Sequence, residues 1–400
     1  MTYQRHSLRL LLGVVLGAAA FVLGPVSPAV AQTYDDVPAD HWARAAIDWV
    51  TDQGPVDDRV LDDYDVLFRP GRLVTRRQLA RALVVARGHQ DDVVTDPVFL
   101  GDVVPDLDPY YWDIQIAIKL GLMLPTLDLF NPLGTVPAAK AERAVIRTLQ
   151  LLHPEADWTL LSTLRPAVWR PNPDWNTQAP ALLPWIVASR HLLLRFNHPY
   201  PDGEILERSP GEAVSRAEIA YMLWKGLPVA DWRLGGLDDY AAITFPLLSY
   251  RPRQVTKFAL KYIGYPYVYG GEWPTADSPY GYQAHGGFDC SGFVWWVLKV
   301  RFDYPIYERT ASDMARKADP RITRSGLKCG DIMFFGYDGT ASTASQIYHA
   351  GIYLGRGWFI HSTGSSAGVM LASLNASAYW SEHFAWGRRV LKPAELVVTL

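Results

Sequence analysis

The pattern of apolar and polar positions divides the chain into a helical first part and a mixed second part. From residue 34 to residue 227, apolar residues recur at helical spacing, and turns rich in proline, glycine and aspartate separate the helical stretches. After residue 250, one more helical stretch gives way to short alternating stretches that are typical of strands. The pattern therefore predicts a mostly α-helical array, a linker at residues 228–250 without a clear period, and a final part that contains both helices and strands.

The helical part contains a pattern that recurs three times. An aspartate-valine turn, a tryptophan, a first helix, an F-x-P turn and a second helix occur in residues 33–90 and again in residues 97–152. A third, divergent copy occupies residues 178–227, after an insert rich in proline and tryptophan. The second helices are expected to begin at the segments TRRQ, AKAE and SRAE. Aligning these segments gives three equivalent cations: Arg76, Lys140 and Arg216.

The N-terminus has the features of a secretory signal. Arg5 and Arg9 precede an apolar run that ends at Leu23, and the small-residue motif AVA ends at Ala31. The run is short for a bilayer span, and no other stretch reaches the length of a membrane helix. We therefore expect residues 1–31 to be removed on export, with a retained anchor as the alternative.

Composition narrows the classes of function. Of the 400 residues, 49% are hydrophobic and 20% are charged, which suits two or three folded domains. The net charge of −3 gives no support for a nucleic-acid binder, which normally has a basic face. The two cysteines are Cys290 and Cys329, and in an exported protein they raise the alternative of a disulfide.

The residues around Cys290 favour a nucleophile instead. The stretch FDCSGFVWWVLKVRF predicts a buried helix that begins at Asp289 or Cys290. A thiol at a helix N-terminus lies near unpaired N–H groups and the positive end of the helix dipole, which favour the thiolate. The same N–H groups can stabilise an oxyanion. The alternative is a buried structural cysteine, which is the ordinary state of a free cysteine.

Two histidines further along the chain can supply a base and a group that orients it. The stretch YHAGIYLGRGWFIHSTG predicts a β-hairpin with a three-residue turn, GRG. If Leu354 pairs with Trp358, then Gly351 faces His361, and His349 is a diagonal neighbour on the same face. A slip of one residue would place the two histidines on opposite faces. In the predicted register, His349 can accept the thiol proton and His361 can orient His349.

The second part of the chain, by these motifs, closely resembles the NlpC family of cell-wall cysteine peptidases. The resemblance covers roughly residues 250–392 and rests on the ordered segments PYVYGG, DCSGFV, ERT, GDIMFF and HAGIYLGRGWFIH. It implies a papain-like α+β fold for residues 251–392 and cleavage of peptidoglycan stem peptides, usually at the γ-D-glutamyl bond to the diamino acid. The catalytic residues that it implies are Cys290 as nucleophile, His349 as base and His361 as the orienting residue. The substrate-binding residues that it implies are Tyr267, Asp289, Ser291 and Arg309.

This part of the chain also departs from the usual pattern of that family. Cys329 stands where a proline is usual, and Met314 stands where a glutamine is common. The loops at residues 272–288 and 336–348 look long, which predicts an altered cleft. His285, in the first of these loops, is expected to be a surface histidine.

The helical part resembles S-layer homology repeats. The resemblance covers roughly residues 33–227, through the D-V, H-W, F-x-P and T-R-A-E elements. It implies a three-lobed helical prism whose grooves hold cell-wall polymers. Cations at helix starts suit anionic sugar polymers, and the positions implied are Arg76, Lys140 and Arg216. The second copy lacks the threonine, and solvated basic residues on a purely structural array are the alternative.

Together these features predict an exported, wall-associated peptidoglycan hydrolase. Its expected partners are stem peptides and a cell-wall polymer, with no nucleic acid and no membrane span in the mature protein. No cofactor or metal is expected, because Cys290, His349 and His361 lack the fourth ligand and the CxxC spacing of a zinc site. The alternatives are an amidase or acyltransferase on the same fold, and a wall-binding structural protein with a silent peptidase domain.

Overall fold

The computed structural model describes most of the chain beyond the expected signal segment. The described residues are 34–52, 60–61, 66–105, 107–169, 181–196, 207–283, 285–364 and 367–398. The predicted signal segment, residues 1–31, and much of the insert before the third copy lie outside the described residues. Residues 32–400 form one compact unit. In the described part, none of the helices combines the length and apolarity needed to cross a membrane.

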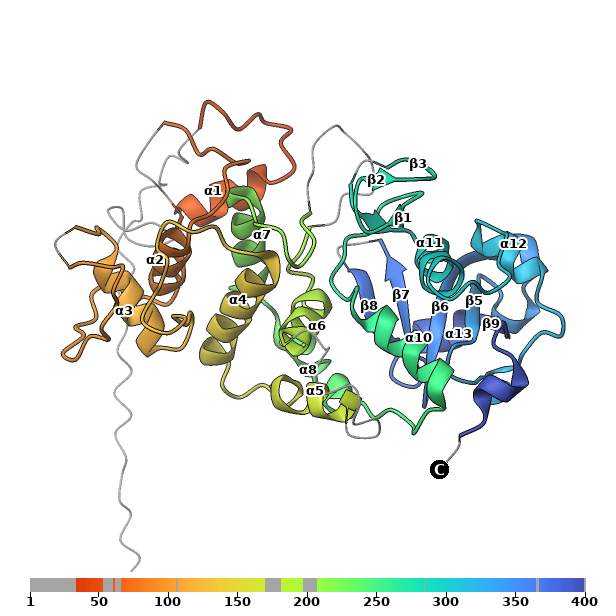
Figure 1. Ribbon diagram of the computed structural model, residues 1–400. Helices are drawn as coiled ribbons and strands as arrows, with labels where there is room; N and C mark the ends of the chain where they lie inside the picture. The colour runs from red at the N-terminus through yellow and green to blue at the C-terminus, as the bar shows by residue number, and fades with distance from the viewer. Residues whose placement is uncertain are drawn as a thin grey trace, which may run out of the picture. The chain divides into compact units, whose positions relative to one another are not determined.

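Helices are the main regular elements in the first part of the chain (Figure 1). They are α1 (Arg44–Asp52), α2 (Arg76–Ala86), α3 (Tyr111–Lys119), α4 (Ala138–Leu152), α5 (Leu160–Trp169), α6 (Leu183–His191) and α7 (Arg216–Gly226). Thr75 and Ser215 begin α2 and α7 with capping boxes, in which the side chains at the third helical position, Gln78 and Glu218, bond back to the cap. These are the segments TRRQ and SRAE, so the predicted starts of both helices are confirmed.

Three extended segments that precede α2, α4 and α7 pair with one another in a closed ring. The N–H of Val74 donates to Val214 O at 3.0 Å, the N–H of Val214 donates to Val136 O at 3.0 Å, and the N–H of Val136 donates to Val74 O at 3.2 Å. Each segment therefore pairs with both of the others, which gives the three second helices a quasi-threefold relation. The three segments of the ring belong to the three copies of the recurring sequence pattern, one segment to each copy.

The ring defines which helix positions are equivalent, and it corrects one prediction. The first N–H group of each second helix donates an equivalent hydrogen bond to a carbonyl of the next copy. These bonds run from Arg76 to Gly134 O, from Ala138 to Glu212 O, and from Arg216 to Arg72 O. Lys140 therefore lies two residues further along its helix, at the level of Gln78 and Glu218, and its predicted equivalence with the two arginines is wrong. The reason is that α4 begins early, directly after Pro137, so the segment AKAE lies inside the helix.

The aspartate-valine turns and the F-x-P turns of the first two copies are bonded to each other. The carboxylate of Asp36 accepts the N–H groups of Phe68 at 2.8 Å and Arg69 at 2.7 Å. Asp102 accepts the N–H groups of Phe130 and Asn131 in the same way, at 2.9 and 2.6 Å. Because these backbone donors have no ladder partner, the aspartates satisfy them. This explains why the two motifs occur together in each copy.

The predicted linker is built into the core. It contains the short helices α8 (Asp231–Gly235) and α9 (Asp238–Ala241). Leu237, Ile243 and Phe245 are buried, and the hydroxyl of Tyr240 donates to Leu371 O at 3.4 Å. The segment therefore packs against the rest of the chain along its length.

The second part is an α+β domain around a five-stranded antiparallel sheet. The strand order is β8-β7-β6-β5-β9, formed by β5 (Ile332–Gly336), β6 (Ile347–Gly355), β7 (Trp358–Thr363), β8 (Gly368–Ser373) and β9 (Phe384–Arg388). The helices are α10 (Tyr250–Leu260), α11 (Cys290–Trp295), α12 (Ala311–Arg316) and α13 (Ala378–His383), and α11 continues as a π-helix, η2 (Trp296–Val300). Helix α11 packs against β6 and β7 (Figure 1). The predicted α+β class of this part is confirmed.

Short elements complete the domain. Two small antiparallel pairs lie before α11: β1 (Glu272–Trp273) with β4 (Gly287–Phe288), and β2 (Asp277–Ser278) with β3 (Gly281–Tyr282). Four 3-10 turns follow: η3 (Arg324–Gly326), η4 (Gly339–Ala341), η5 (Ala344–Gln346) and η6 (Pro393–Leu396). The two long loops predicted at residues 272–288 and 336–348 are thus partly ordered by β1–β4 and by η4 and η5.

Candidate active site

Cys290 is held rigidly at the start of α11. Asp289 is the N-cap residue of this helix, and its Oδ1 accepts the N–H of Gly292 at 2.6 Å. Behind Cys290 the helix is anchored by fully buried side chains: Phe293, Val294, Val297 and Leu298. Cys290 itself is 9% exposed, so the sulfur lies at the edge of the protein interior. The predicted start of the helix is confirmed.

The protonation state of Cys290 differs from the prediction. Burial raises the pKa of the thiol to about 12, and the negative charge of Asp289 raises it as well. The backbone N–H groups of Ala350 and Ser291 act in the opposite direction but do not outweigh burial. Burial therefore favours the neutral thiol in the resting site, in contrast to the thiolate expected from the helix start. A base must take the proton as the sulfur attacks.

The two cysteines do not form a disulfide. Cys290 and Cys329 are both free and buried. Cys329 lies 3.1 Å from the hydroxyl oxygen of Thr256 on α10, which gives it a partner of its own. The disulfide that was left open from the sequence is excluded by this arrangement.

His349 and His361 lie on the same face of the sheet and contact each other. His349 comes from β6 and His361 from β7, and the distance from His349 Nε2 to His361 Nδ1 is 2.7 Å. Ile352 lies opposite Ile360, which places Gly351 opposite His361, as predicted. The diagonal contact expected between the two histidines is therefore present.

The turn of the hairpin differs from the prediction although the register holds. Gly355 pairs with Trp358 across a two-residue turn, and Leu354 is left over as a bulge. Arg356 and Gly357 both have positive φ, 52° and 87°, as a type I′ turn requires. The predicted pairing of Leu354 with Trp358 is wrong, but the bulge compensates for the shorter turn, so both histidines still share a face.

Aromatic rings enclose the histidine pair. The rings of Trp380 and Phe359 lie 4.8 and 4.9 Å from the ring of His361, and Phe335 lies 5.7 Å from that of His349. Burial among these rings lowers the pKa of His349 to about 3, and burial together with the nearby His349 lowers the pKa of His361. Both imidazoles are therefore neutral at ordinary pH.

The tautomers follow from the geometry. If His349 Nδ1 is to accept a proton, then the proton of neutral His349 must reside on Nε2 and be donated to His361 Nδ1. His361 then carries its own proton on Nε2, and that atom is buried without a hydrogen-bond partner among the described residues. The nearby ring of Trp380, perpendicular to that of His361, can receive such an N–H as a weak interaction. The sequence analysis missed Trp380, because nothing in its local pattern separates it from ordinary packing residues.

Arg309 connects the residues that were predicted to bind substrate. Its guanidinium donates to both carboxylate oxygens of Asp289 at 3.0 Å, and to the hydroxyl of Ser291 at 3.1 Å. It also donates to the carbonyls of Gly270 and Gly271, and its Nε donates to a carboxylate oxygen of Glu272 at 2.7 Å. Glu272 was not among the residues predicted from the sequence. The double glycine, the helix cap and the ERT segment are thus one network.

Tyr267 belongs to the same site. Burial raises the pKa of its hydroxyl, and the neighbouring acidic groups of Cys290 and Asp289 raise it further. These influences require Tyr267 to be close to both residues. The structure therefore gathers Tyr267, Asp289, Ser291 and Arg309 beside Cys290.

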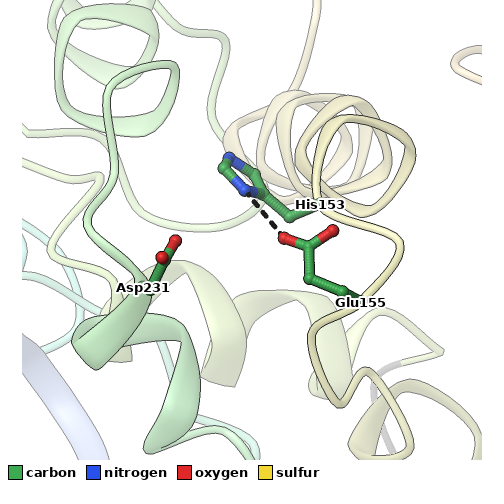
Figure 2. Close-up of side chains that lie close together, drawn as sticks. All are labelled: His153, Glu155 and Asp231. Atoms are coloured by element: carbon green, nitrogen blue, oxygen red, sulfur yellow. Dashed lines mark ion pairs between the residues drawn. The ribbon is translucent and has the colours of Figure 1, made fainter. Parts of the chain in front are cut away.

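A second group of titratable side chains lies in the helical part. Among the described residues, the histidine and carboxylate atoms that converge closely enough to hold a metal ion belong to His153, Glu155 and Asp231 (Figure 2). These atoms lie within 4.8 Å of one another, and His153 Nδ1 is 3.4 Å from Glu155 Oε1. Glu155 and Asp231 are exposed, and a simple contact between His153 and Glu155 accounts for the pair. The cluster shares no residue with the site of Cys290.

The basic residues predicted to bind a polymer have different environments. Arg76 lies beside a cavity of about 340 Å³ that is also lined by Lys140 and Arg143. Arg76 donates to Leu124 O at 3.0 Å. Arg216 is only 1% exposed, and its Nε donates to Phe68 O at 2.6 Å. The structure therefore brings Arg76 and Lys140 to one groove, whereas Arg216 is a buried structural residue.

Comparisons with known proteins agree with this geometry in the second part of the chain. Residues 264–389 match the NlpC/P60 family. Murein DD-endopeptidase MepH of Escherichia coli K12 is 36% identical over 152 residues, which cover 36% of this chain and 49% of MepH. The bifunctional muramidase/DL-endopeptidase CwlT of Bacillus subtilis 168 is 38% identical over 138 residues, which cover 34% of this chain and 35% of CwlT.

A solved structure is also similar to this part of the chain. The NlpC/p60 domain of the peptidoglycan hydrolase SagA is 27% identical, with a TM-score of 0.27, and the match covers 35% of this chain and 99% of that domain. The chain spans about half the length of MepH and about a third of the length of CwlT. All of these matches cover about a third of this chain. Residues 264–389, which hold Cys290, His349 and His361, are therefore the part of the chain that is similar to the NlpC/P60 family.

Proposed function

We propose that this protein is an exported endopeptidase that cleaves the stem peptides of peptidoglycan with Cys290 as its nucleophile. The observation that carries the proposal is the 2.7 Å contact between His349 and His361 beside the start of α11. The contact supports an oriented base next to a fixed thiol, which is the arrangement that nucleophilic catalysis needs. The NlpC/P60 match supports the wall as the location of the substrate.

The chemistry proceeds in two halves. His349 Nδ1 takes the thiol proton while the sulfur of Cys290 forms a bond to the carbonyl carbon, and backbone N–H groups at the start of α11 stabilise the oxyanion. The C–N bond then breaks, and the imidazolium of His349 returns its proton to the leaving amine. A water molecule, deprotonated by His349, attacks the thioester and releases the acid and the thiol. His361 keeps His349 in the tautomer that both halves require.

The bond between γ-D-glutamate and the diamino acid is our first choice of target. The name of CwlT includes a DL-endopeptidase activity, whereas MepH is named as a DD-endopeptidase, so relatives act on more than one bond. Asp289 supports the first choice. Its Oδ2 accepts one bond from Arg309 among the described residues, so this oxygen can also accept a substrate ammonium next to Cys290.

Mass spectrometry of products from purified peptidoglycan tests the proposal. Wild-type protein should release fragments with a new N-terminus at the diamino acid, and Cys290→Ala should release none. Cys329→Ala is the matched control, because it removes the other buried cysteine and should leave the products unchanged. Cleavage by a folded Cys290→Ala protein would exclude the thiol mechanism. Products joined to a new acyl partner, without hydrolysis, would favour the acyltransferase alternative.

We also propose that residues 33–227 are S-layer homology repeats that hold the enzyme on a wall polymer. The ring of segments before α2, α4 and α7 supports three related units, and the groove beside Arg76 and Lys140 supports an anionic ligand. The double variant Arg76→Gln/Lys140→Gln should sediment less with purified cell walls than the wild type does. Lys317→Gln removes an exposed charge elsewhere and should sediment normally. Equal sedimentation of all three proteins would contradict the role of this groove.

A further inference from the structure

A larger cavity lies at the end of α7, and it shares no lining residue with the groove of Arg76. It has a volume of about 560 Å³, within the usual range for ligand pockets. Its walls come from the end of α6, the last turns of α7 and the start of α8. Two tryptophans and two cations are among the lining side chains: Trp224, Lys225, Trp232 and Arg233. No function assigned above involves these residues.

Two positive charges line this cavity, and the described part of the chain places no carboxylate in salt-bridge contact with them. Lys225 and Arg233 line it, and among the described residues neither forms a salt bridge and no acidic side chain lines the walls. Burial lowers the pKa of Lys225, and the positive charge of Arg233 lowers it further, so the two charges are close enough to repel. Asp231, which precedes Trp232, is directed toward His153 and Glu155 (Figure 2). It therefore does not neutralise the cavity.

Two tryptophans provide flat apolar surface beside these charges. The ammonium of Lys225 lies 4.2 Å from the ring centre of Trp224, and the guanidinium of Arg233 lies 4.8 Å from that of Trp232. Trp232 is 74% exposed, an unusual position for the largest apolar side chain. The cations are thus supported by rings, and most of the surface of Trp232 is open to a ligand.

We propose that this cavity binds an acidic saccharide. The apolar face of a sugar ring can stack on an indole, and a carboxylate or phosphate on the sugar can pair with Lys225 and Arg233 together. A neutral sugar would leave both cations unpaired, and a long polyanion such as nucleic acid is disfavoured by the net charge of −3. The site is separate from the peptidase chemistry and from the groove of Arg76, so it stands or falls independently of both.

Isothermal titration calorimetry on the full chain tests the proposal with three defined sugars. Digalacturonic acid carries carboxylates, galactose 1-phosphate carries a phosphate, and galactobiose is the matched neutral disaccharide. At least one acidic sugar should bind, and it should bind at least about tenfold more tightly than galactobiose, because charge-assisted hydrogen bonds are lost in the neutral ligand. The tighter of the two acidic ligands identifies the acid that the cavity prefers.

Variants locate the binding. Lys225→Gln/Arg233→Gln should weaken the binding of the acidic sugar at least about tenfold, and Trp232→Ala, which removes an exposed ring, should weaken it severalfold. Lys317→Gln removes one exposed charge elsewhere and should bind normally. Thermal unfolding checks that each variant is folded. Equal binding of galactobiose, no binding of either acidic sugar, or unchanged binding by the folded double variant would overturn the proposal.

Discussion

The close approach of α11 to the double-glycine turn makes Gly292→Ala a sharp test of the active-site geometry. A Cβ atom at this position would lie 2.1 Å from the carbonyl oxygen of Gly271 and 2.9 Å from Arg309 Nη2. Side chains can move away, but the carbonyl belongs to the backbone. The helix and the turn must therefore separate, and Cys290, two residues before Gly292, moves with the helix.

The structure suggests the size of each effect. Relieving the contact requires a shift of about 1 Å, and overpacking of this kind costs about 1–3 kcal/mol, which the better helix propensity of alanine offsets by about 1 kcal/mol. We therefore expect a loss of at most about 2 kcal/mol in the free energy of unfolding. A misplacement of about 1 Å between reacting groups can lower the rate about 100-fold. Activity should fall much more than stability.

Urea unfolding and hydrolysis of a stem peptide measure the two effects on the same protein. Gly235→Ala is the matched control, because no atom lies within 4 Å of a Cβ at that position and the residue ends a helix in the first part of the chain. It should change neither quantity appreciably. A Gly292→Ala protein with wild-type activity would show that the contact does not position Cys290, and the reasoning would fail.

Three further predictions concern the same site. His361→Asn should retain more activity than His361→Ala, because an amide oxygen can accept the proton of His349 Nε2; wild-type activity in both would remove His361 from the mechanism. Burial lowers the pKa of His349 to about 3 from an ordinary value of 6.5, and burial together with the nearby His349 lowers the pKa of His361. As the pH falls, these two histidines bind protons in the unfolded chain before they do so in the folded chain. Their contribution to the free energy of unfolding is therefore complete above pH 6.5 and is lost as the pH drops toward 3. A Tm that stays constant across this window would contradict the assignment of neutral, buried histidines. A free tripeptide should be cleaved with a kcat/KM about one to two decades above that of its N-acetylated form if Asp289 binds the ammonium, and equal values would show that it does not.

The face of each histidine could be predicted from the sequence, whereas the turn between them could not. The period of two along a strand places residues on a face wherever the hairpin turns, provided that the parity is right. A three-residue turn and a two-residue turn with a bulge at Leu354 have the same parity. The choice between them depends on the positive φ of Arg356, which its residue type does not favour and which only the finished hairpin explains.

The ionisation of Cys290 shows the limit of a local argument. The helix N-terminus and the N–H of Ser291 are local features, and they favour the thiolate as predicted. Desolvation comes from packing against β6 and β7, which lie more than fifty residues away in the chain. Its effect on the pKa is the larger one. The position of the nucleophile could therefore be predicted, but its resting charge could not.

The same distinction between local pattern and packing decides how many polymer grooves the helical ring can offer. In the threefold relation, the first residue of each second helix corresponds in the same way to the third residue of the second helix in the next copy. The three resulting pairs are Arg76 with Lys140, Ala138 with Glu218, and Arg216 with Gln78. Only the first of these pairs carries two cations, and its members line one cavity. Arg216, in the third pair, is buried against Phe68. Among the described residues of this ring, the pair of Arg76 and Lys140 is thus the one suited to an anionic polymer, and the proposed contribution of the ring to wall binding should depend on these two residues.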